Sequence, residues 1–123
     1  MKYVILIHSN PQPWGHPTID FTEVGRAIPA DERAAMGKEF EEMLTELSES
    51  GELVSGQALG PAAGAKLYRT GLNGRVTTDG PYAEAKEHLA GFFLIDVDSE
   101  ERADAIAQRF AGPGDTIELR ATM

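Results

Sequence analysis

Cysteine is absent from this sequence of 123 residues, and cationic residues are scarce. Without cysteine there are no disulfides, no thiolate metal sites and no cysteine nucleophile, and a cysteine-free acidic chain is compatible with the cytoplasmic location that we predict. Lys and Arg number 11 against 20 Asp and Glu, which gives a formal net charge of -9. Because phosphate backbones are bound by clustered Lys and Arg, and no such cluster occurs, we expect no direct binding to nucleic acid.

Long hydrophobic runs and cofactor motifs are also missing. The start MKYVILIHSN is too short to span a membrane and has no small-residue cleavage site, so it predicts a strand and no membrane association. Since GxGxxG, P-loop, GxSxG and HExxH patterns do not occur, we predict no cofactor and no metal site. The length, with 41% hydrophobic and 25% charged residues, fits a single globular domain over residues 1–123.

Helical periodicity predicts two helices. Apolar residues at helical spacing indicate a first helix that begins at an N-cap residue, Asp31, and ends at Gly51, a residue type that often follows a helix C-terminus. Asp98 and Glu101 form the pattern of a capping box, and an apolar stripe over residues 103–110 follows them. The sequence therefore predicts a second, shorter helix near the end of the chain.

Apolar runs and turn residues predict the strands, over residues 2–8, 52–59, 65–70, 75–79, 91–97 and 116–120. The pair Asn73-Gly74 indicates a hairpin, because both residue types tolerate positive φ. Residues 9–30 contain four prolines and no clear period, which is typical of a long loop that binds ligands or acts as a lid. This order of elements predicts an α+β, ferredoxin-like sandwich with an antiparallel sheet and an extra hairpin.

The strands predicted at residues 2–8 and 91–97 are apolar on both faces. Two helices cover only one face of a sheet, and a monomer rarely leaves a large apolar patch in water. We therefore predict a homodimer in which two sheets pack face to face. The alternative is that the loop over residues 9–30 folds over the open face.

Four stretches of the sequence are similar to YCII-related domains, and more closely to their DGPF branch: MKYVILIH, SGELVSGQAL, VTTDGPYAEAKEHLAGFFLIDVDS and TIELR. The resemblance covers nearly the whole chain outside residues 9–30. It implies a dimeric α+β barrel type of assembly, in agreement with the two-faced strands, and a largely uncharacterised function. The Asp-Gly-Pro-Phe motif of the branch ends here in Tyr82, and its usual Lys-Glu-Gln ends in His88.

The resemblance also bears on catalysis and regulation. Some YCII proteins carry a His on the first helix and an Asp near its end, which have been proposed as an active-site pair, and one branch is linked to dehydrochlorinase activity. The matching positions here are Phe40 and Glu49, so the resemblance gives little support to catalysis by such a pair. Some DGPF members occur beside sigma factors, which makes regulation an alternative by analogy.

The stretch TTDGPYAEAKEH gathers titratable residues beside a turn signal. Asp79, before Gly80-Pro81, has two readings that stay open: its carboxylate caps the turn, or it acts as a general base that is shielded by Tyr82. His8 ends a central strand where loops begin, either as an acid or as a hydrogen-bonded strand-end residue. We assign Asp79, His8 and Tyr82 as the candidate catalytic residues.

Five further residues are candidates for ligand binding. Trp14 and His16 lie in the long loop, where PWGH forms an aromatic lid or only packs the loop down. Arg69 flanks the hairpin turn and either binds a carboxylate or is simply solvated. Glu84 and His88 share a face if residues 81–88 form a helical turn, although a solvated surface pair is the simpler reading.

These candidates support two classes of function. The first is acid-base catalysis, such as elimination or isomerisation, on a small organic molecule, with Asp79 as base and His8 or Tyr82 as acid. The alternative is a non-catalytic module that binds a small molecule or regulates a partner, for example through its acidic helix. An enzyme is expected to place at least two titratable groups within hydrogen-bond reach inside one pocket.

Overall fold

The computed structural model describes residues 1–83 and 85–123, and it confirms an α+β fold with an antiparallel sheet. The main sheet has four strands in the order β2-β5-β1-β6, and every neighbouring pair is antiparallel. The strands are β1 (Lys2–Ser9), β2 (Leu53–Ala58), β5 (His88–Asp96) and β6 (Thr116–Ala121). Both neighbours of the central strand β1 therefore come from the last third of the chain.

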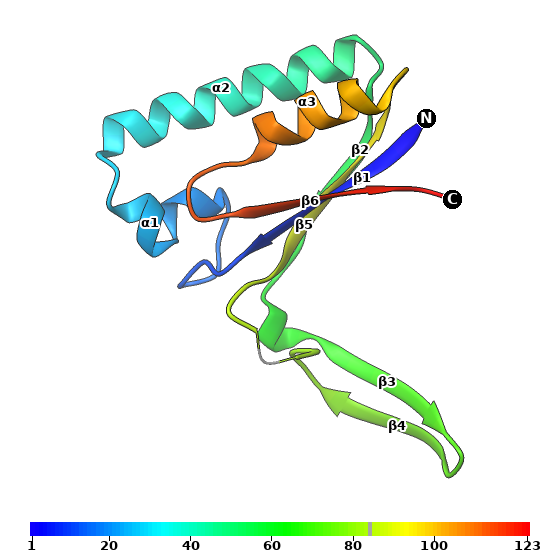
Figure 1. The fold of residues 1–123 in the computed structure, drawn as a ribbon. Helices are drawn as coiled ribbons and strands as arrows, with labels where there is room; N and C mark the ends of the chain where they lie inside the picture. The colour runs from blue at the N-terminus through cyan, green and yellow to red at the C-terminus, as the bar shows by residue number, and fades with distance from the viewer. Residues whose placement is uncertain (84) are drawn as a thin grey trace.

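Two helices lie side by side on one face of this sheet (Figure 1). They are α2 (Ala30–Glu49) and α3 (Glu100–Phe110), each of which follows one strand of the sheet and precedes another. Among the described residues, none of the helices combines the length and the apolar character that a membrane crossing requires. Shorter elements are η1 (Thr18–Asp20), α1 (Glu23–Arg26) and η2 (Ala62–Gly64).

Both helices begin at a residue other than the one predicted. The N-cap of α2 is Pro29, and Asp31 lies in the first turn, where a carboxylate favours the positive end of the helix dipole. The N-cap of α3 is Ser99, whose hydroxyl accepts from the Arg102 amide at 3.1 Å, so the predicted capping box at Asp98 is wrong by one residue. The predicted ending of α2 is confirmed, because Gly51 follows it with a φ of 79°.

The hydrophobic core lies between the two helices and the sheet. Odd-numbered strand residues face it, and Ile5 and Ile95 are completely buried there. The apolar stripe predicted for α3 is confirmed, because Ala103, Ile106 and Phe110 are buried in the same cluster. Burial of such side chains is worth about 1.5–3 kcal/mol each for the larger ones, so this layer supplies most of the stability of the domain.

The opposite face of the sheet carries apolar side chains and has no covering layer. Val4 and Leu6 of β1 lie opposite Leu94 and Phe92 of β5 in the strand register, and all four are only half-buried. Residues that are paired across antiparallel strands share a face, so these four form one patch, which we call the open face. The prediction that the central strands are apolar on both faces is thus confirmed.

The alternative that the loop over residues 9–30 covers this open face is wrong for the isolated chain. The loop contains η1 and α1, which lie on the helix side of the sheet (Figure 1). Asp20 accepts from Arg33 of α2 at 3.0 Å, and the Thr18 hydroxyl donates to Asp115 at 2.8 Å. These contacts hold the loop against the end of the helix layer, so the open face stays uncovered.

A separate two-stranded hairpin projects from the body of the molecule (Figure 1). It consists of β3 (Lys66–Gly71) and β4 (Gly74–Asp79), and we call residues 66–79 the arm. The predicted hairpin is confirmed, but its turn lies one residue earlier than expected, at Leu72-Asn73. Only Gly74 has positive φ there, at 99°. The arm leaves the sheet on the side opposite to α2 and α3.

Candidate functional site

The base of the arm borders an open hollow of about 550 Å³. Its walls come from the segment after β2, from the Pro81-Tyr82 turn and from the start of β5. The lining residues are Leu59, Gly60, Pro61, Ala62, Gly64, Ala65, Pro81, Tyr82, His88 and Leu89. This volume falls within the range of about 300–1,000 Å³ that small-molecule sites occupy.

A close approach between Gly80 and Ala65 shapes the hollow. The Gly80 amide donates to the Ala65 carbonyl at 2.6 Å, which joins the two segments that lead into the arm. A Cβ atom on Gly80 would lie 2.7 Å from the Ala65 Cβ and 2.9 Å from its carbonyl oxygen. Gly80 has no positive φ, so glycine is required here for contact with Ala65 and not for an unusual backbone conformation.

Tyr82 and His88 are the titratable groups among the described residues that line the hollow. Tyr82 is 77% exposed, and His88 is half-buried at the start of β5, opposite Ser9 of β1. The remaining walls are apolar side chains and backbone. A hydroxyl and an imidazole on an apolar surface can orient a small polar molecule through two hydrogen bonds, but no hydrogen bond joins them within the described residues.

Two residues of the long loop are attached to the rim of this hollow. The Trp14 indole donates to the Leu59 carbonyl at 2.9 Å, and His16 Nε2 lies 3.0 Å from the same oxygen. His16 donates to that carbonyl in the tautomer that carries its proton on Nε2. The two rings meet edge to face with centroids 6.4 Å apart. The predicted aromatic lid is therefore placed beside the hollow, although neither ring is part of its lining.

His8 lies elsewhere, on the open face of the sheet. Its Nε2 is 2.9 Å from Glu118 Oε1, and Glu118 also forms an ion pair with Arg120. The hydrogen bond from His8, followed by that from Arg120, lowers the pKa of the Glu118 carboxyl below its usual value. A carboxylate that holds an imidazole in this way fixes its orientation, which is one requirement of a general acid or base.

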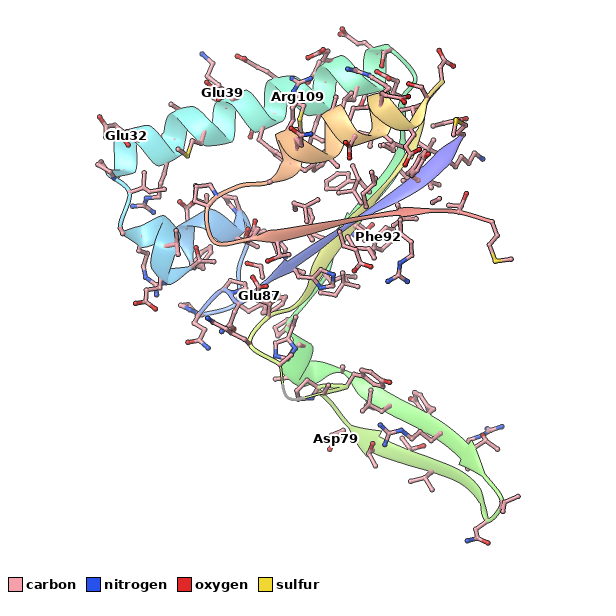
Figure 2. All side chains as sticks on the ribbon, in the orientation of Figure 1. Glu32, Glu39, Asp79, Glu87, Phe92 and Arg109 are labelled. Atoms are coloured by element: carbon pink, nitrogen blue, oxygen red, sulfur yellow. The ribbon has the colours of Figure 1, made fainter. Side chains whose placement is uncertain are left out.

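The remaining predicted site residues do not converge with these groups. Asp79 ends β4 opposite Lys66, outside the lining of the hollow, and Figure 2 shows it on the arm, away from Phe92 of the sheet. Arg69 lies within the arm opposite Val76. Glu84 is outside the described residues, so the predicted pair of Glu84 and His88 has no structural description. The structure thus gathers Tyr82, His88, Trp14 and His16, and leaves His8, Asp79 and Arg69 apart.

A buried polar cluster at the start of β6 had no signal in the sequence. Asp115 accepts from the Thr18 hydroxyl, and the completely buried Ser9 hydroxyl lies near the same carboxylate. Burial raises the pKa of Asp115, and the two hydroxyls offset part of this rise. Ser9 Oγ and Asp115 Oδ1 have no well-formed hydrogen bond within the described residues. Thr18 and Asp115 are 97 positions apart, so no local pattern predicts their contact.

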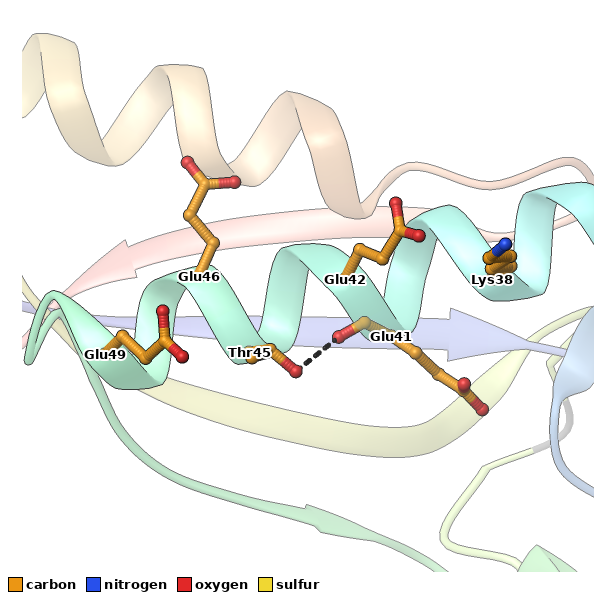
Figure 3. Close-up of a pocket in the computed structure, with 6 residues that line it drawn as sticks. All are labelled: Lys38, Glu41, Glu42, Thr45, Glu46 and Glu49. Carbon is orange, nitrogen blue, oxygen red and sulfur yellow. Dashed lines mark hydrogen bonds between the residues drawn. The ribbon is translucent and has the colours of Figure 1, made fainter.

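An acidic groove runs along the exposed side of α2 (Figure 3). It has a volume of about 410 Å³ and is lined by Lys38, Glu41, Glu42, Thr45, Glu46 and Glu49. Its polar groups are engaged only in part: Thr45 donates to the Glu41 carbonyl at 3.1 Å, and Glu46 pairs with Arg109 of α3. In the part of the chain that the structure describes, no group of three or more His, Asp or Glu side chains is arranged to hold a metal ion.

Comparison with known proteins identifies one family. The family model described as YCII-related domain matches residues 1–114, which include every element up to the loop before β6. No curated protein matches the chain. The family match therefore covers the hollow, the arm, the acidic groove and His8 together.

Proposed function

This chain belongs to the YCII-related domain family, and we propose from this premise that it is a homodimeric domain that binds a small organic molecule in the hollow at the base of the arm. The observation that carries the proposal is the hollow itself. Apolar walls with a few directed polar groups are the usual composition of a small-molecule site. Tyr82 and His88 supply those polar groups, and Trp14 and His16 hold the long loop against the rim.

Binding is favoured over catalysis inside the hollow. The described lining contains no two titratable side chains that are joined by a hydrogen bond, and Asp79 does not line it. A general base needs hydrogen-bond reach to the proton that it removes, and it needs a pKa that suits this task. The hollow has the composition of a binding pocket and lacks the paired groups that proton transfer needs.

We expect the homodimer to form through the open face. The strand order and the pair of helices on one face correspond to a ferredoxin-like arrangement, which we propose for this fold. Val4, Leu6, Phe92 and Leu94 would then pack against the same residues of a second copy, as in assemblies of the dimeric α+β barrel type. An isologous contact of this kind covers apolar side chains that the chain itself leaves half-buried.

The motif Asp79-Gly80-Pro81-Tyr82 and the family match support assignment to the DGPF branch, which we include in the proposal. A regulatory role, including one beside sigma factors, and a cytoplasmic location belong to the same proposal. The positions of the His-Asp pair of other members are occupied by Phe40, which packs against Phe93 and Phe110, and by Glu49 of the acidic groove. Catalysis by such a pair is not part of the proposal.

Thermal shift with benzoate, benzamide and phenol as probes tests binding in the hollow. A probe at one hundred times its Kd raises the free energy of unfolding by about 2.7 kcal/mol. Tyr82→Phe removes one hydroxyl from the hollow and is expected to weaken binding by about fivefold, the worth of one neutral hydrogen bond. The matched control is Tyr3→Phe, which removes the same group from the core, away from the hollow. If both variants weaken binding equally, or if neither does, the hollow is not the site.

A second candidate function is acid-base catalysis on the open face. The 2.9 Å contact between His8 and Glu118 is the observation that favours it. Incorporation of solvent deuterium into a bound carbon acid, followed by proton NMR, would report such activity. His8→Asn is expected to abolish the exchange and Asp79→Asn to preserve it. If Asp79→Asn abolishes exchange and His8→Asn does not, Asp79 is the base, as in the first hypothesis.

A further inference from the structure

Every residue of the arm except the half-buried Leu67 is exposed. Tyr68 and Val76 are 66% and 56% exposed, and Leu72 at the tip is completely exposed. Hydrogen bonds pair β3 with β4, and the arm is joined to the body through the contact between Ala65 and Gly80 at its base. A hairpin of two strands is at best marginally stable in water when it packs against nothing else. The arm therefore requires a surface that its own chain does not provide.

The direction of the arm identifies that surface as part of a second copy of this chain. The arm extends β2 and β5, whose open face is the uncovered side of the sheet, and it points away from the sheet on that same side (Figure 1). A second copy seated on the open face would therefore lie beside the arm. Because the dimer contact is isologous, each copy would be flanked by the arm of the other.

The length of the arm sets how far it reaches. Six residues in each strand extend about 20 Å at about 3.4 Å per residue. Sheets that pack face to face lie about 10 Å apart, and helices pack on a sheet at a similar distance. An arm of this length passes the edge of the facing sheet and reaches the helix layer behind it.

The charges of the arm and the body are complementary. Within the arm, Lys66, Arg69 and Arg75 outweigh Asp79, for a net charge of +2, whereas the whole chain has a net charge of -9. The rest of the chain therefore carries -11. Four of the carboxylates on the body, Glu41, Glu42, Glu46 and Glu49, line the acidic groove of α2 (Figure 3). Opposite net charge on the arm and on the body of a second copy favours the encounter and the orientation of two copies.

The hollow is incomplete without this contact. Tyr82 is one of the two described titratable residues that line it, and it is 77% exposed. Small-molecule sites normally bury about 70–90% of the surface of their ligand, which an open hollow does not achieve. A second copy beside the base of the arm would supply the missing wall.

We propose that the arm clasps a second copy of this chain and that each hollow becomes a closed pocket only in the resulting pair. This inference rests on the homodimer proposed above and adds to it a role for residues 66–79. Binding of the small molecule and pairing of the chains are then coupled, because the ligand occupies a pocket that only the pair completes.

Replacement of the arm by two glycines tests the proposal. The ends of the deletion are adjacent, since the Gly80 amide lies 2.6 Å from the Ala65 carbonyl, and the core does not include the arm. Sedimentation across a concentration series is expected to show two chains for the full protein. For the armless variant, the dissociation constant of the pair rises by about tenfold or more. Benzoate binding weakens in parallel, and circular dichroism reports whether the variant folds.

Point variants separate the arm from the body. Arg69→Glu with Arg75→Glu reverses two charges and is expected to raise the dissociation constant of the pair by a similar factor, more strongly at low salt. The matched control, Arg26→Glu with Arg102→Glu, makes the same change of net charge on the helix side. Neither residue belongs to the arm, to the open face or to the acidic groove, so we expect the dissociation constant of the pair to stay unchanged.

The results distinguish the clasp by the arm from the sheet-to-sheet homodimer on which it rests. A full protein that pairs with the same dissociation constant with and without its arm overturns the clasp and leaves the sheet-to-sheet dimer standing. Phe92→Asp on the open face should break that dimer and remove the hydrogen-exchange protection of the arm amides, while the amides of α3 stay protected. Arm amides that remain equally protected in Phe92→Asp also overturn the clasp. One chain at every concentration refutes the homodimer and the clasp together.

Discussion

The resemblance to YCII proteins places Phe40 where some members carry a histidine, and replacement of Phe40 tests whether its side chain serves packing. Its ring meets Phe110 edge to face with centroids 5.5 Å apart, and it meets Phe93 at 6.3 Å. Each such pair is worth about 0.5–1.5 kcal/mol beyond the area that it buries. Phe40→Leu keeps an apolar side chain and loses both pairs, so we expect it to lower the free energy of unfolding by about 1–3 kcal/mol.

Phe40→His restores the family residue and is expected to cost more. An imidazole at this position loses apolar contact and brings polar nitrogens against Phe93 and Phe110, whose rings offer no hydrogen-bond acceptor or donor of their own. Leaving such a group unsatisfied adds about 1–3 kcal/mol to the loss. The restored histidine would therefore destabilise the domain, and we expect it to create no catalytic pair with Glu49.

Equilibrium unfolding in guanidinium chloride measures both changes, at several protein concentrations because a homodimer makes the midpoint concentration-dependent. Met36→Leu is the matched control on the same helix, since Met36 is exposed and lies outside the aromatic cluster. A double-mutant cycle of Phe40→Leu and Phe110→Leu should give a coupling of about 0.5–1.5 kcal/mol. The reasoning is refuted if Phe40→His costs no more than the Met36 control, or if the coupling is zero.

Three further predictions follow from contacts outside this cluster. Glu52 accepts two hydrogen bonds from Arg102, at 2.7 and 2.8 Å, and this pairing lowers the pKa of Glu52. Because both side chains are partly exposed, a double-mutant cycle should give a coupling energy of only about 0.5–1 kcal/mol, and a smaller one in high salt. Burial raises the pKa of Asp115 above its usual 3.8, so its contribution to stability is complete below that pH and is lost as the pH rises through the folded-state pKa. The unfolding free energy of Asp115→Asn, measured in urea, should therefore rise relative to that of the original chain as the pH increases from 4 to 7. A difference between the two proteins that stays the same over this range would contradict the prediction. Gly80→Ala places a methyl group against Ala65, so the amide at position 80 should exchange with solvent about tenfold faster while the global unfolding free energy changes by less than about 1 kcal/mol.

The sheet and the helices were predictable because their signals are local. The apolar stripe of α3 and the apolar character of both faces of β1 depend only on neighbouring residues, and the stripe predicted the buried side chains of α3 correctly. The predicted N-caps of the two helices were wrong by one or two residues. Ser99 takes the N-cap position of α3 in place of Asp98, and Pro29 takes that of α2 in place of Asp31. Such choices depend on the angle at which the chain enters the helix, which the composition of the turn does not fix.

The candidate site was predictable only in part, because its assembly depends on where the arm leaves the sheet. Tyr82 and His88 are close in the sequence and line the same hollow, although the sequence patterns grouped Tyr82 with His8 and Asp79 and paired His88 with Glu84. His8 ends the central strand and contacts Glu118 on the open face, a pairing that requires the strand register. Trp14 and His16 reach Leu59 across 45 and 43 positions, and only the folded chain brings these segments together.

The central position of β1 has a consequence for the order of events during synthesis. Among the strands of the sheet, β1 is translated first, yet its hydrogen-bonding neighbours on both edges, β5 and β6, are the last two of these strands. Until they emerge, the nascent chain carries an unpaired ribbon of isoleucine, leucine and valine that is open to wrong partners. Completion of the sheet is therefore expected to wait until β6 has emerged, and it is slowed by the closure of the long loop between β1 and β6.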